Sequence, residues 1–136
     1  MKTKDKKKST KPSPSLPVLG RKVSKFTQLD TFPAPRGVAT VTCVSDEVTA
    51  LCPVTGQPDW YTVTVKYVPN DLCVESKSLK LYLQSFRNMG HFCENFAGII
   101  AERLYVTLRA QEVRVSVLQK PRGGIAIESE ACFPCD

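Results

Sequence analysis

Apolar and polar side chains alternate clearly from Trp60 to Val68. The apolar positions that share one side of an extended chain are Val63, Val65 and Tyr67, and polar residues lie between them. Because a strand turns successive side chains to opposite faces, this alternation predicts a strand with one buried face. Turn-forming residues at 69–71 end it, and a shorter β-rich run precedes it at 39–44.

After this strand the spacing of the apolar residues becomes that of a helix. The spacing i, i+3, i+4 and i+7 holds for Leu79, Tyr82, Leu83 and Phe86. Gly90 is expected to end this helix. A second apolar stripe predicts another helix, with Phe92, Phe96, Ile99, Ile100 and Leu104 on its buried side.

Strand character returns at Val113, Val115 and Val117. Residues 121–124 (Pro-Arg-Gly-Gly) predict a turn, and residues 125–127 predict a last short strand. The order strand, strand, helix, helix, strand, strand predicts an α+β domain in which an antiparallel four-stranded sheet carries two helices on one face. The two edges of such a sheet need cover, and oligomerisation into a ring is one way to provide it.

The basic residues are concentrated in one segment. The chain has 136 residues, enough for one domain, and a formal net charge of +6. Residues 1–22 hold seven Lys, one Arg and one Asp, so they carry +7 and leave −1 for residues 23–136. Because the segment is rich in Lys, Ser and Pro and poor in apolar residues, we expect a disordered basic tail followed by a single folded domain at 23–136.

No apolar stretch follows the basic start, and no run of about 18 apolar residues occurs, so neither a signal peptide nor a membrane span is expected. We therefore predict a soluble, cytoplasmic protein without a membrane partner. Nucleic acid would be bound only weakly, through the tail.

Six cysteines occur, at positions 43, 52, 73, 93, 132 and 135, and in such a protein they are expected to be reduced. Cys132 and Cys135 form a CxxC pair near the C-terminus. The pair could serve in metal binding or redox chemistry, but two ordinary free thiols are the alternative.

The segment LCPVTGQPDW, residues 51–60, holds the first candidate for chemistry. Cys52 precedes a proline in a turn-forming stretch, and Asp59 follows seven residues later. A loop constrained by two prolines and a glycine could bring the two side chains together. A thiolate is a nucleophile and a nearby carboxyl group can supply a proton, so the pair fits covalent catalysis. Half-buried loop cysteines without a catalytic role are common, however.

Two basic clusters are candidates for phosphate binding. Lys77 and Lys80 lie at the expected start of the first helix, where free backbone N–H groups and positive potential suit an anion. Arg122 and Gly123 place a cation beside backbone that a phosphate could approach. A solvated basic face is the alternative for each cluster.

His91 and Glu94 lie near the start of the second helix. The only histidine, His91, has no nucleophile motif beside it, and we expect it to be a hydrogen-bonded surface or interface side chain. Glu94 could accept paired hydrogen bonds from the amidine-like edge of a base, and an exposed helical glutamate is the alternative.

These segments together closely resemble one enzyme family. LCPVTGQPDW at 51–60, VESKSLKLYLQSFRN at 74–88 and PRGG at 121–124 are similar to motifs of the NADPH-dependent 7-cyano-7-deazaguanine reductases of queuosine biosynthesis. LDTFPAP at 29–35 resembles the N-terminal segment of that family. The resemblance extends from about Leu29 to Glu128, and its ESKSLK motif is highly specific.

The resemblance implies the tunnelling fold, in which antiparallel sheets from several subunits form a barrel. It also implies a homo-oligomer of two stacked rings, a decamer, with active sites at the subunit interfaces. The implied reaction is a four-electron reduction of the nitrile of 7-cyano-7-deazaguanine to an aminomethyl group, with NADPH as the cofactor and no metal.

Roles for individual residues follow from the same resemblance. Cys52 would attack the nitrile carbon to form a covalent thioimide, and Asp59 would protonate the nitrogen. The substrate would be contacted by Val74, Glu75, Ser76, Cys93 and Glu94. The NADPH phosphates would be held by Lys77, Lys80, Arg122 and Gly123.

One residue departs from the family pattern. The family commonly has a histidine directly before the recognition glutamate, whereas this chain has Cys93 before Glu94. A thiol cannot replace imidazole as a general acid or as a two-sided hydrogen-bonding group. The change could slow the reaction, change the substrate or mark a branch with different proton handling.

Two other functions share part of this pattern. A related amidinotransferase would form the same thioimide on a nitrile-bearing deazaguanine in tRNA and let ammonia attack it, without the NADPH motif. A non-catalytic ring subunit would need neither Cys52 nor Asp59. The intact ESKSLK motif and the Cys52–Asp59 pair favour the reductase.

Overall fold

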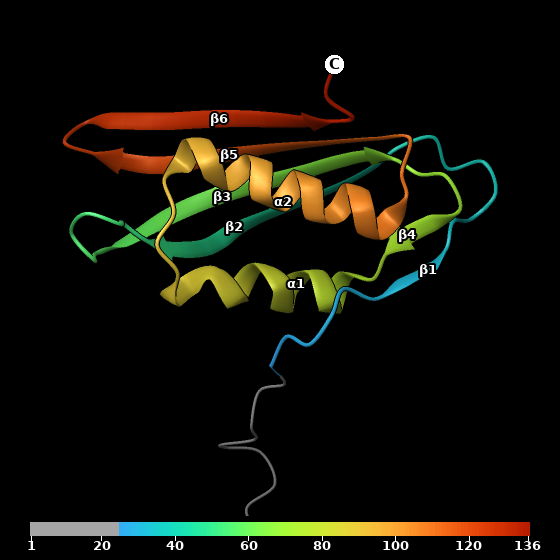
Figure 1. Cartoon of the computed structure of the whole chain (residues 1–136), viewed down its shortest axis with the longest axis horizontal. Helices are drawn as coiled ribbons and strands as arrows, with labels where there is room; N and C mark the ends of the chain where they lie inside the picture. Colours follow the sequence, from blue (N-terminus) through green and yellow to red (C-terminus); the bar gives the residue numbers. More distant parts are fainter. Residues whose placement is uncertain (1–24) are drawn as a thin grey trace, which may run out of the picture.

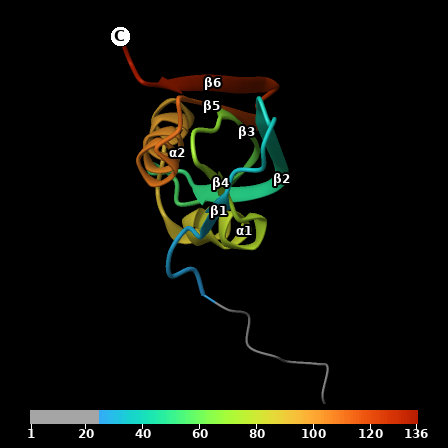
Figure 2. The same ribbon diagram turned by 90° about the vertical axis from the view of Figure 1, so that its right-hand side faces the viewer.

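A curved antiparallel sheet with two helices against its inner face makes up most of the structure (Figures 1 and 2). The computed structural model describes residues 25–136, and the predicted basic tail at 1–22 lies outside the described residues. In chain order the elements are β1 (Thr31–Pro33), β2 (Val41–Leu51), β3 (Pro58–Val68), β4 (Leu72–Val74), α1 (Ser76–Gln84), the 3-10 helix η1 (Ser85–Asn88), α2 (Cys93–Leu108), β5 (Glu112–Arg122) and β6 (Ile125–Phe133).

The main sheet has the strand order β2-β3-β5-β6, and each neighbouring pair is antiparallel. Val65 of β3 pairs directly with Val115 of β5, so the apolar positions of these strands lie side by side. The predicted alternation is confirmed, because the inner face is buried at Val63, Val65, Tyr67, Val113, Val115 and Val117.

Both helices cover this inner face, as predicted. The apolar side of α1 is buried at Leu79, Tyr82 and Leu83, and Phe86 follows it from η1. Along β5 and β6, α2 buries Phe96, Ile100 and Leu104. The sequence therefore predicts the α+β architecture correctly. None of the described helices is long and apolar enough to cross a bilayer.

The alternation pattern does not reveal a second, two-stranded sheet of β1 and β4, because each of these strands has only three residues. The Tyr67 hydroxyl accepts a 3.0 Å hydrogen bond from the Val74 N–H. Glu75 N–H donates to the Asp30 carbonyl at 2.8 Å. The first contact attaches the segment before α1 to β3, and the second attaches it to the residue before β1. Together they fix where α1 begins.

β2 is longer than predicted. It continues past Val44 to Leu51, whereas the sequence pattern ends at residue 44. A β-bulge between Ser45 and Val48 shifts the register against β3 and interrupts the alternation that would have revealed the second half of the strand.

The chain after Gly90 differs from the prediction in two places. Phe92, expected on the buried stripe of the second helix, precedes α2 as its N-cap and is 54% exposed. β6 continues to Phe133 although Glu128 and Glu130 are polar, because it is an edge strand with one face open to solvent.

At one end of the sheet, the inner-face positions become polar. Because the strands are antiparallel, β2 ends, β3 begins and β5 ends at this same end. Cys52, Asp59 and Gln119 occupy the next inner-face positions of those strands, and each is at most 6% exposed. The alternation that builds the core therefore also gathers a thiol, a carboxyl group and an amide.

Replacement of Ile100, which is fully buried in α2, with alanine should lower the free energy of unfolding by about 2–5 kcal/mol, because it leaves a cavity against the sheet. Val106→Ala on the exposed side of the same helix should change it by less than about 0.5 kcal/mol. Urea denaturation at matched protein concentration measures both. Equal losses would contradict the assigned inner face of α2.

Candidate active site

Cys52 lies at the start of the turn between β2 and β3. Its N–H donates to the Gln57 carbonyl at 2.8 Å, and its carbonyl accepts from the Gly56 N–H at 2.9 Å. Gly56 has a φ of +69°, a left-handed conformation that favours glycine. The turn therefore closes on itself and fixes the Cys52 backbone.

The residue before Cys52 ties this turn to the segment that leads into α2. The Leu51 N–H donates to the Met89 carbonyl at 2.8 Å, and the Leu51 carbonyl accepts from the His91 N–H at 3.1 Å. As a result, the nucleophile candidate and the start of α2 lie at the same end of the molecule (Figure 1).

The surroundings of Cys52 favour its thiolate. Hydrogen bonds from the Thr55 hydroxyl, the Thr55 N–H and the Val54 N–H lower the pKa of Cys52 to about 7. Partial burial opposes this effect, and Arg122 adds a smaller contribution that lowers the pKa further. A large fraction of Cys52 is therefore in its nucleophilic form at neutral pH.

The Asp59 side chain is 3% exposed and has one cationic partner. Arg122 Nε lies 3.3 Å from Asp59 Oδ1, and the Arg122 side chain is about half exposed. No hydrogen bond from residues 25–136 reaches this oxygen. Asp59 therefore has charge compensation, while one of its buried oxygens has no hydrogen bond from the described residues.

Gln119 and Tyr61 form the buried side of this ion pair. In the amide orientation that satisfies both of its neighbours, the Gln119 oxygen accepts from Arg122 Nε at 3.0 Å and from Nη2 at 3.1 Å. The other end of the amide faces Tyr61, 3.4 Å from the hydroxyl oxygen. Burial and the charge of Asp59 raise the pKa of Tyr61, so its hydroxyl stays protonated.

A β-bulge brings Arg122 into this cluster. In a regular strand, Gln119 and Arg122 would point to opposite faces, because they are three residues apart. The pairing of β5 with β6 shifts register between these two residues, which re-aims the arginine. Gly123 and Gly124, with φ of +58° and +80°, form the turn into β6. The predicted turn is confirmed there, whereas Pro121 and Arg122 belong to β5.

The start of α2 brings Cys93 and Glu94 to the same end. The Cys93 thiol is buried, and its sulfur lies 3.5 Å from the carbonyl oxygens of both Val117 and Ile127, which share its single hydrogen as acceptors. Burial raises the pKa of Cys93, and both Cys93 and Cys52 are free thiols. Glu94 is exposed in the first turn, where the helix dipole favours a negative charge. Glu94 is therefore open to a ligand, and Cys93 is not.

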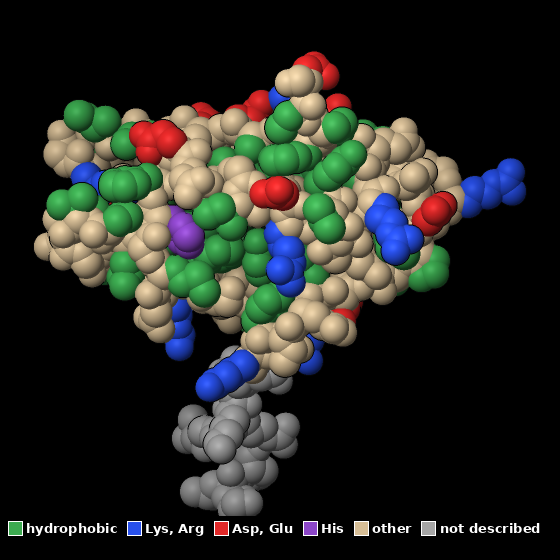
Figure 3. Space-filling model, viewed as in Figure 1, with side chains coloured by type: hydrophobic (Ala, Val, Ile, Leu, Met, Phe, Trp, Pro, Cys, Tyr) green, Lys and Arg blue, Asp and Glu red, His purple; other side chains and the backbone are tan. Residues whose placement is uncertain are grey.

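His91 differs from the prediction. Its ring stacks on Phe96 at 5.6 Å with 2° between the planes, and it meets the edge of Phe86 at 5.6 Å. Nε2 is buried and has no hydrogen-bond partner in the described part of the chain, although a hydrogen-bonded histidine was expected. Figure 3 shows this histidine in purple, bordered by hydrophobic side chains.

The basic cluster at the start of α1 also requires a correction. Glu75 is the N-cap, and its carboxylate accepts from the N–H groups of Lys77 at 2.7 Å and Ser78 at 2.8 Å. These bonds lower the pKa of Glu75. The helix amides expected to be free for an anion are thus occupied. The side chains of Ser76, Lys77 and Lys80 remain exposed.

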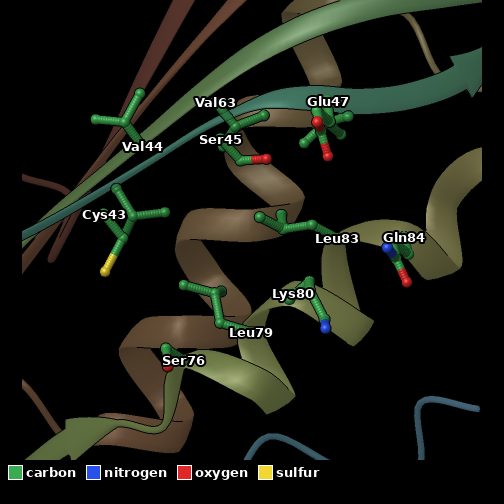
Figure 4. Close-up of a pocket in the computed structure, with 12 residues that line it drawn as sticks. Cys43, Val44, Ser45, Glu47, Val63, Ser76, Leu79, Lys80, Leu83 and Gln84 are labelled. Carbon is green, nitrogen blue, oxygen red and sulfur yellow. The ribbon is translucent and has the colours of Figure 1, made fainter. Parts of the chain in front are cut away.

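A pocket of about 260 Å³ lies between α1 and β2 (Figure 4). Ser76 and Lys80 line it from α1, and Ser45 and Glu47 line it from β2. Apolar side chains of the core make up much of the remaining wall. Val74, which precedes this helix, is 6% exposed and belongs to the core.

The two groups of predicted site residues are well separated in one chain. The β4–α1 junction and the β2–β3 turn lie at opposite ends of the molecule (Figure 1). At about 1.5 Å per α-helical residue and about 2 Å per 3-10 residue, α1 and η1 span about 20 Å between Ser76 and the segment beside Leu51. Cys52, Asp59, Glu94 and Arg122 therefore lie together, and the residues at 75–80 do not join them.

Three residues of the Cys52 cluster are not identified from the motifs. Tyr61 and Gln119 follow from the alternation itself, because the inner-face positions of β3 and β5 continue to them. Thr55 has no such signal, since its donation to Cys52 depends on the closed shape of the turn.

Comparison with known proteins gives one matching family model. Residues 58–134, more than half of the chain, match the model described as QueF-like protein. This range includes Asp59, the start of α1 and the Arg122 turn.

Curated relatives are similar over a somewhat longer stretch. A protein from Agrobacterium fabrum named NADPH-dependent 7-cyano-7-deazaguanine reductase is 51% identical over 82 residues, which cover 60% of this chain and 53% of that protein. A protein of the same name from Syntrophobacter fumaroxidans is 48% identical over 102 residues, 74% of this chain and 66% of that protein. The chain thus spans between about half and two thirds of the length of these relatives.

Among solved structures, the archaeosine synthase QueF-Like in the apo form is similar, with a TM-score of 0.69 at 20% identity. The match covers 74% of this chain and 99% of that one. At this identity the likeness shows that the fold is shared, which supports the predicted tunnelling-type fold.

Alkylation of Cys52 by iodoacetamide should rise with pH to a midpoint near 7, because only the thiolate reacts. Thr55→Val removes the strongest stabilising donor and should move the midpoint to higher pH. Thr42→Val, on the exposed face of the same hairpin, is the matched control. Peptide mass spectrometry identifies the modified cysteine, and an unchanged midpoint in Thr55→Val would contradict the assigned cause.

Proposed function

Because the chain belongs to the QueF-like protein family, we propose that it is an NADPH-dependent 7-cyano-7-deazaguanine reductase of queuosine biosynthesis. The observation that carries the proposal is Cys52, whose pKa is lowered to about 7, at the same end of the sheet as a buried acid, Asp59. A nucleophilic thiol beside a proton source is what addition to a nitrile requires.

Cys52 begins the reaction. Its thiolate adds to the nitrile carbon, one π bond of the nitrile breaks, and the nitrogen takes the proton of the neutral Asp59 carboxyl group, which gives a covalent thioimide and leaves Asp59 as a carboxylate beside Arg122. A nitrile carbon is a poor hydride acceptor, and conversion to the thioimide makes it a better one. Oδ1 of Asp59 receives no hydrogen bond from the described residues, so it is the oxygen we assign to this proton transfer.

NADPH, when bound, would supply hydride, and two molecules of it would provide the four electrons that the aminomethyl product requires, while solvent supplies the protons that do not come from Asp59. The product contains no sulfur, so the carbon–sulfur bond to Cys52 must break before the second hydride completes the reduction, and the thiolate is then restored. Its low pKa makes Cys52 a good leaving group for this step.

Recognition of the deazaguanine would rest mainly on Glu94. Its carboxylate is exposed in the first turn of α2 and can accept two hydrogen bonds from the pyrimidine edge of the substrate. Cys93 would support the site by packing, because its buried thiol is already hydrogen-bonded to backbone carbonyls. Val74, Glu75 and Ser76, which belong to the group of site residues at the β4–α1 junction, would also contact the substrate.

The residues predicted to bind NADPH can hold its phosphates mainly with their side chains. Lys77 and Lys80 are exposed and three residues apart on α1, so their ammonium groups can reach one anion. Backbone donors of α1 would take little part, since Glu75 occupies two of them. Gly123 offers open backbone at the β5–β6 turn. Arg122 would have to leave Asp59 to reach a phosphate.

The complete site would be assembled from neighbouring copies of the chain. The separation of about 20 Å between the α1 motif and the Cys52 cluster supports this arrangement, because one substrate cannot touch both groups in one chain. β2 and β6 are the edge strands of the main sheet and lack strand neighbours within residues 25–136. Pairing at such edges would build the barrel and the stacked rings of a decamer.

The direct test of the reaction mixes the protein, 7-cyano-7-deazaguanine and NADPH and follows the loss of absorbance of the reduced cofactor. We expect two NADPH oxidised for each aminomethyl product. Cys52→Ser should abolish turnover, and Asp59→Asn should lower kcat by about 10²- to 10⁴-fold because it removes the proton donor. A covalent adduct that forms with no NADPH oxidation would contradict the reductase proposal.

Subunit mixing tests the shared site. Cys52→Ser and Lys77→Ala/Lys80→Ala proteins should each be nearly inactive alone. Co-refolded in equal amounts, they should regain activity at about a quarter of the sites, because random neighbours then combine two intact groups. A mixture of Cys52→Ser with Asp59→Asn is the control and should stay inactive, since both changes affect the same group. Failure of the first mixture despite mixed assembly would contradict a site shared between copies.

A further inference from the structure

We infer that Arg122, Gln119 and Tyr61 form a positioning cluster for Cys52 and Asp59, in which Gln119 holds the guanidinium beside the Asp59 carboxylate without letting it hydrogen-bond there. The kinetic consequence of this inference rests on the proposed nitrile chemistry. Its consequence for the ionisation of Cys52 does not depend on that chemistry.

Arg122 directs its hydrogen bonds to Gln119 and not to Asp59. Nε has a single hydrogen, and the Gln119 oxygen accepts it at 3.0 Å. That hydrogen is therefore not directed at Asp59 Oδ1, although this oxygen lies only 3.3 Å from the same nitrogen. Asp59 Oδ1 is buried and receives no hydrogen bond from the described residues. Arg122 thus supplies a positive charge beside Asp59 without using this oxygen as a hydrogen-bond acceptor, so the oxygen can take part in proton transfer.

Gln119 can do this because it is held rigidly. Its side chain is 3% exposed, and it is the direct strand partner of Tyr61 across β3 and β5. Tyr61 is fully buried, and its hydroxyl faces the amide end that Arg122 does not use. With both ends of the amide occupied, Gln119 has one favourable orientation. The bulge between Gln119 and Arg122 then aims the guanidinium at that amide.

The same guanidinium also acts on the ionisation of the nucleophile. The hydrogen bond to Cys52 is the largest of the effects that raise the pKa of Arg122, and in return it favours the thiolate. One cation therefore favours the negative form of both Cys52 and Asp59. It stabilises the thiolate before the addition and the Asp59 carboxylate that remains after its proton has moved to the nitrogen.

This role differs from binding a cofactor phosphate. A phosphate ligand acts on the affinity for NADPH, so its loss raises KM for NADPH. A positioning residue acts on the addition of Cys52 to the nitrile, a step that takes place without NADPH. The half-reaction therefore separates the two roles.

The test compares Arg122→Gln and Gln119→Leu with Lys120→Gln, which removes a cation from the exposed face of the same strand end. Thioimide formation from 7-cyano-7-deazaguanine without NADPH is followed by intact mass. We expect roughly ten- to hundred-fold slower adduct formation in Arg122→Gln and Gln119→Leu, and a wild-type rate in Lys120→Gln. In Gln119→Leu the freed Nε hydrogen should bind Asp59 and block proton transfer. KM for NADPH should not rise in either variant, because neither change removes a cofactor contact.

Alkylation of Cys52 gives a second measurement that does not depend on nitrile chemistry. Arg122→Gln should move the pH midpoint of alkylation above the wild-type value, and Lys120→Gln should leave it in place. Arg122→Lys keeps the positive charge but loses the planar guanidinium and its paired N–H donors. Its midpoint should therefore lie between those of the wild type and Arg122→Gln, while adduct formation stays slow. Tyr61→Phe, which opens no cavity, should slow adduct formation less than Gln119→Leu.

Two results would overturn the inference. The first is a wild-type rate of adduct formation in Arg122→Gln together with a raised KM for NADPH, which would assign Arg122 to the cofactor. The second is an unchanged alkylation midpoint in folded Arg122→Gln. If the wild-type protein forms no adduct at all, the proposed function fails instead, and the alkylation midpoint alone decides for or against the cluster. Far-UV circular dichroism checks that each variant is folded.

Discussion

Burial of every second side chain of β3 and β5 beneath the two helices is the constraint on which the rest of the structure depends. Because the side-chain period of a strand is two, a slip of one residue would move Val65 and Val115 from the core to solvent. The register is therefore strongly fixed by the core. The same register determines which residues lie on the inner face where the strands end, and there it places Asp59 and Gln119. Core packing and the candidate site thus have a common cause.

Polar groups at the end of an apolar face acquire unusual properties. Cys52 has its pKa lowered by donors of its own turn, whereas the Cys93 thiol, buried between α2 and the sheet, has its pKa raised. Two thiols at one end of the molecule are therefore chemically different, and only Cys52 is suited to be a nucleophile. The cation that faces Cys52 and Asp59 reaches them through a β-bulge, a local irregularity that also leaves its side chain half exposed.

The periodic parts of this fold could be predicted from the sequence, and the irregular parts could not. Alternation around Val63 and Val115 predicts the central strands, and the spacing of Leu79 and Leu83 predicts the first helix. The bulge between Ser45 and Val48 hides half of β2, because it breaks the period on which the prediction depends. The three-residue strands β1 and β4 are too short to show any period.

The site follows the same division. Family resemblance points to Cys52 and Asp59, and both lie at one end of the sheet. The position of Arg122 beside Asp59 does not follow from any motif, because it depends on a bulge and on the amide of Gln119. Nor does the sequence indicate that Glu75 would occupy the helix amides considered for phosphate. Each of these features depends on contacts between residues far apart in the chain or on the local shape of a turn.

The register of the core strands would place the reactive thiolate of Cys52 where it can attack a nitrile. Incubation of the protein with 7-cyano-7-deazaguanine alone, followed by intact mass and peptide mapping, tests this placement most directly. We expect a mass increase equal to that of one intact 7-cyano-7-deazaguanine molecule, located on Cys52 and on none of the other five cysteines. The absence of any adduct, or an adduct located on Cys93 or another thiol, would contradict it.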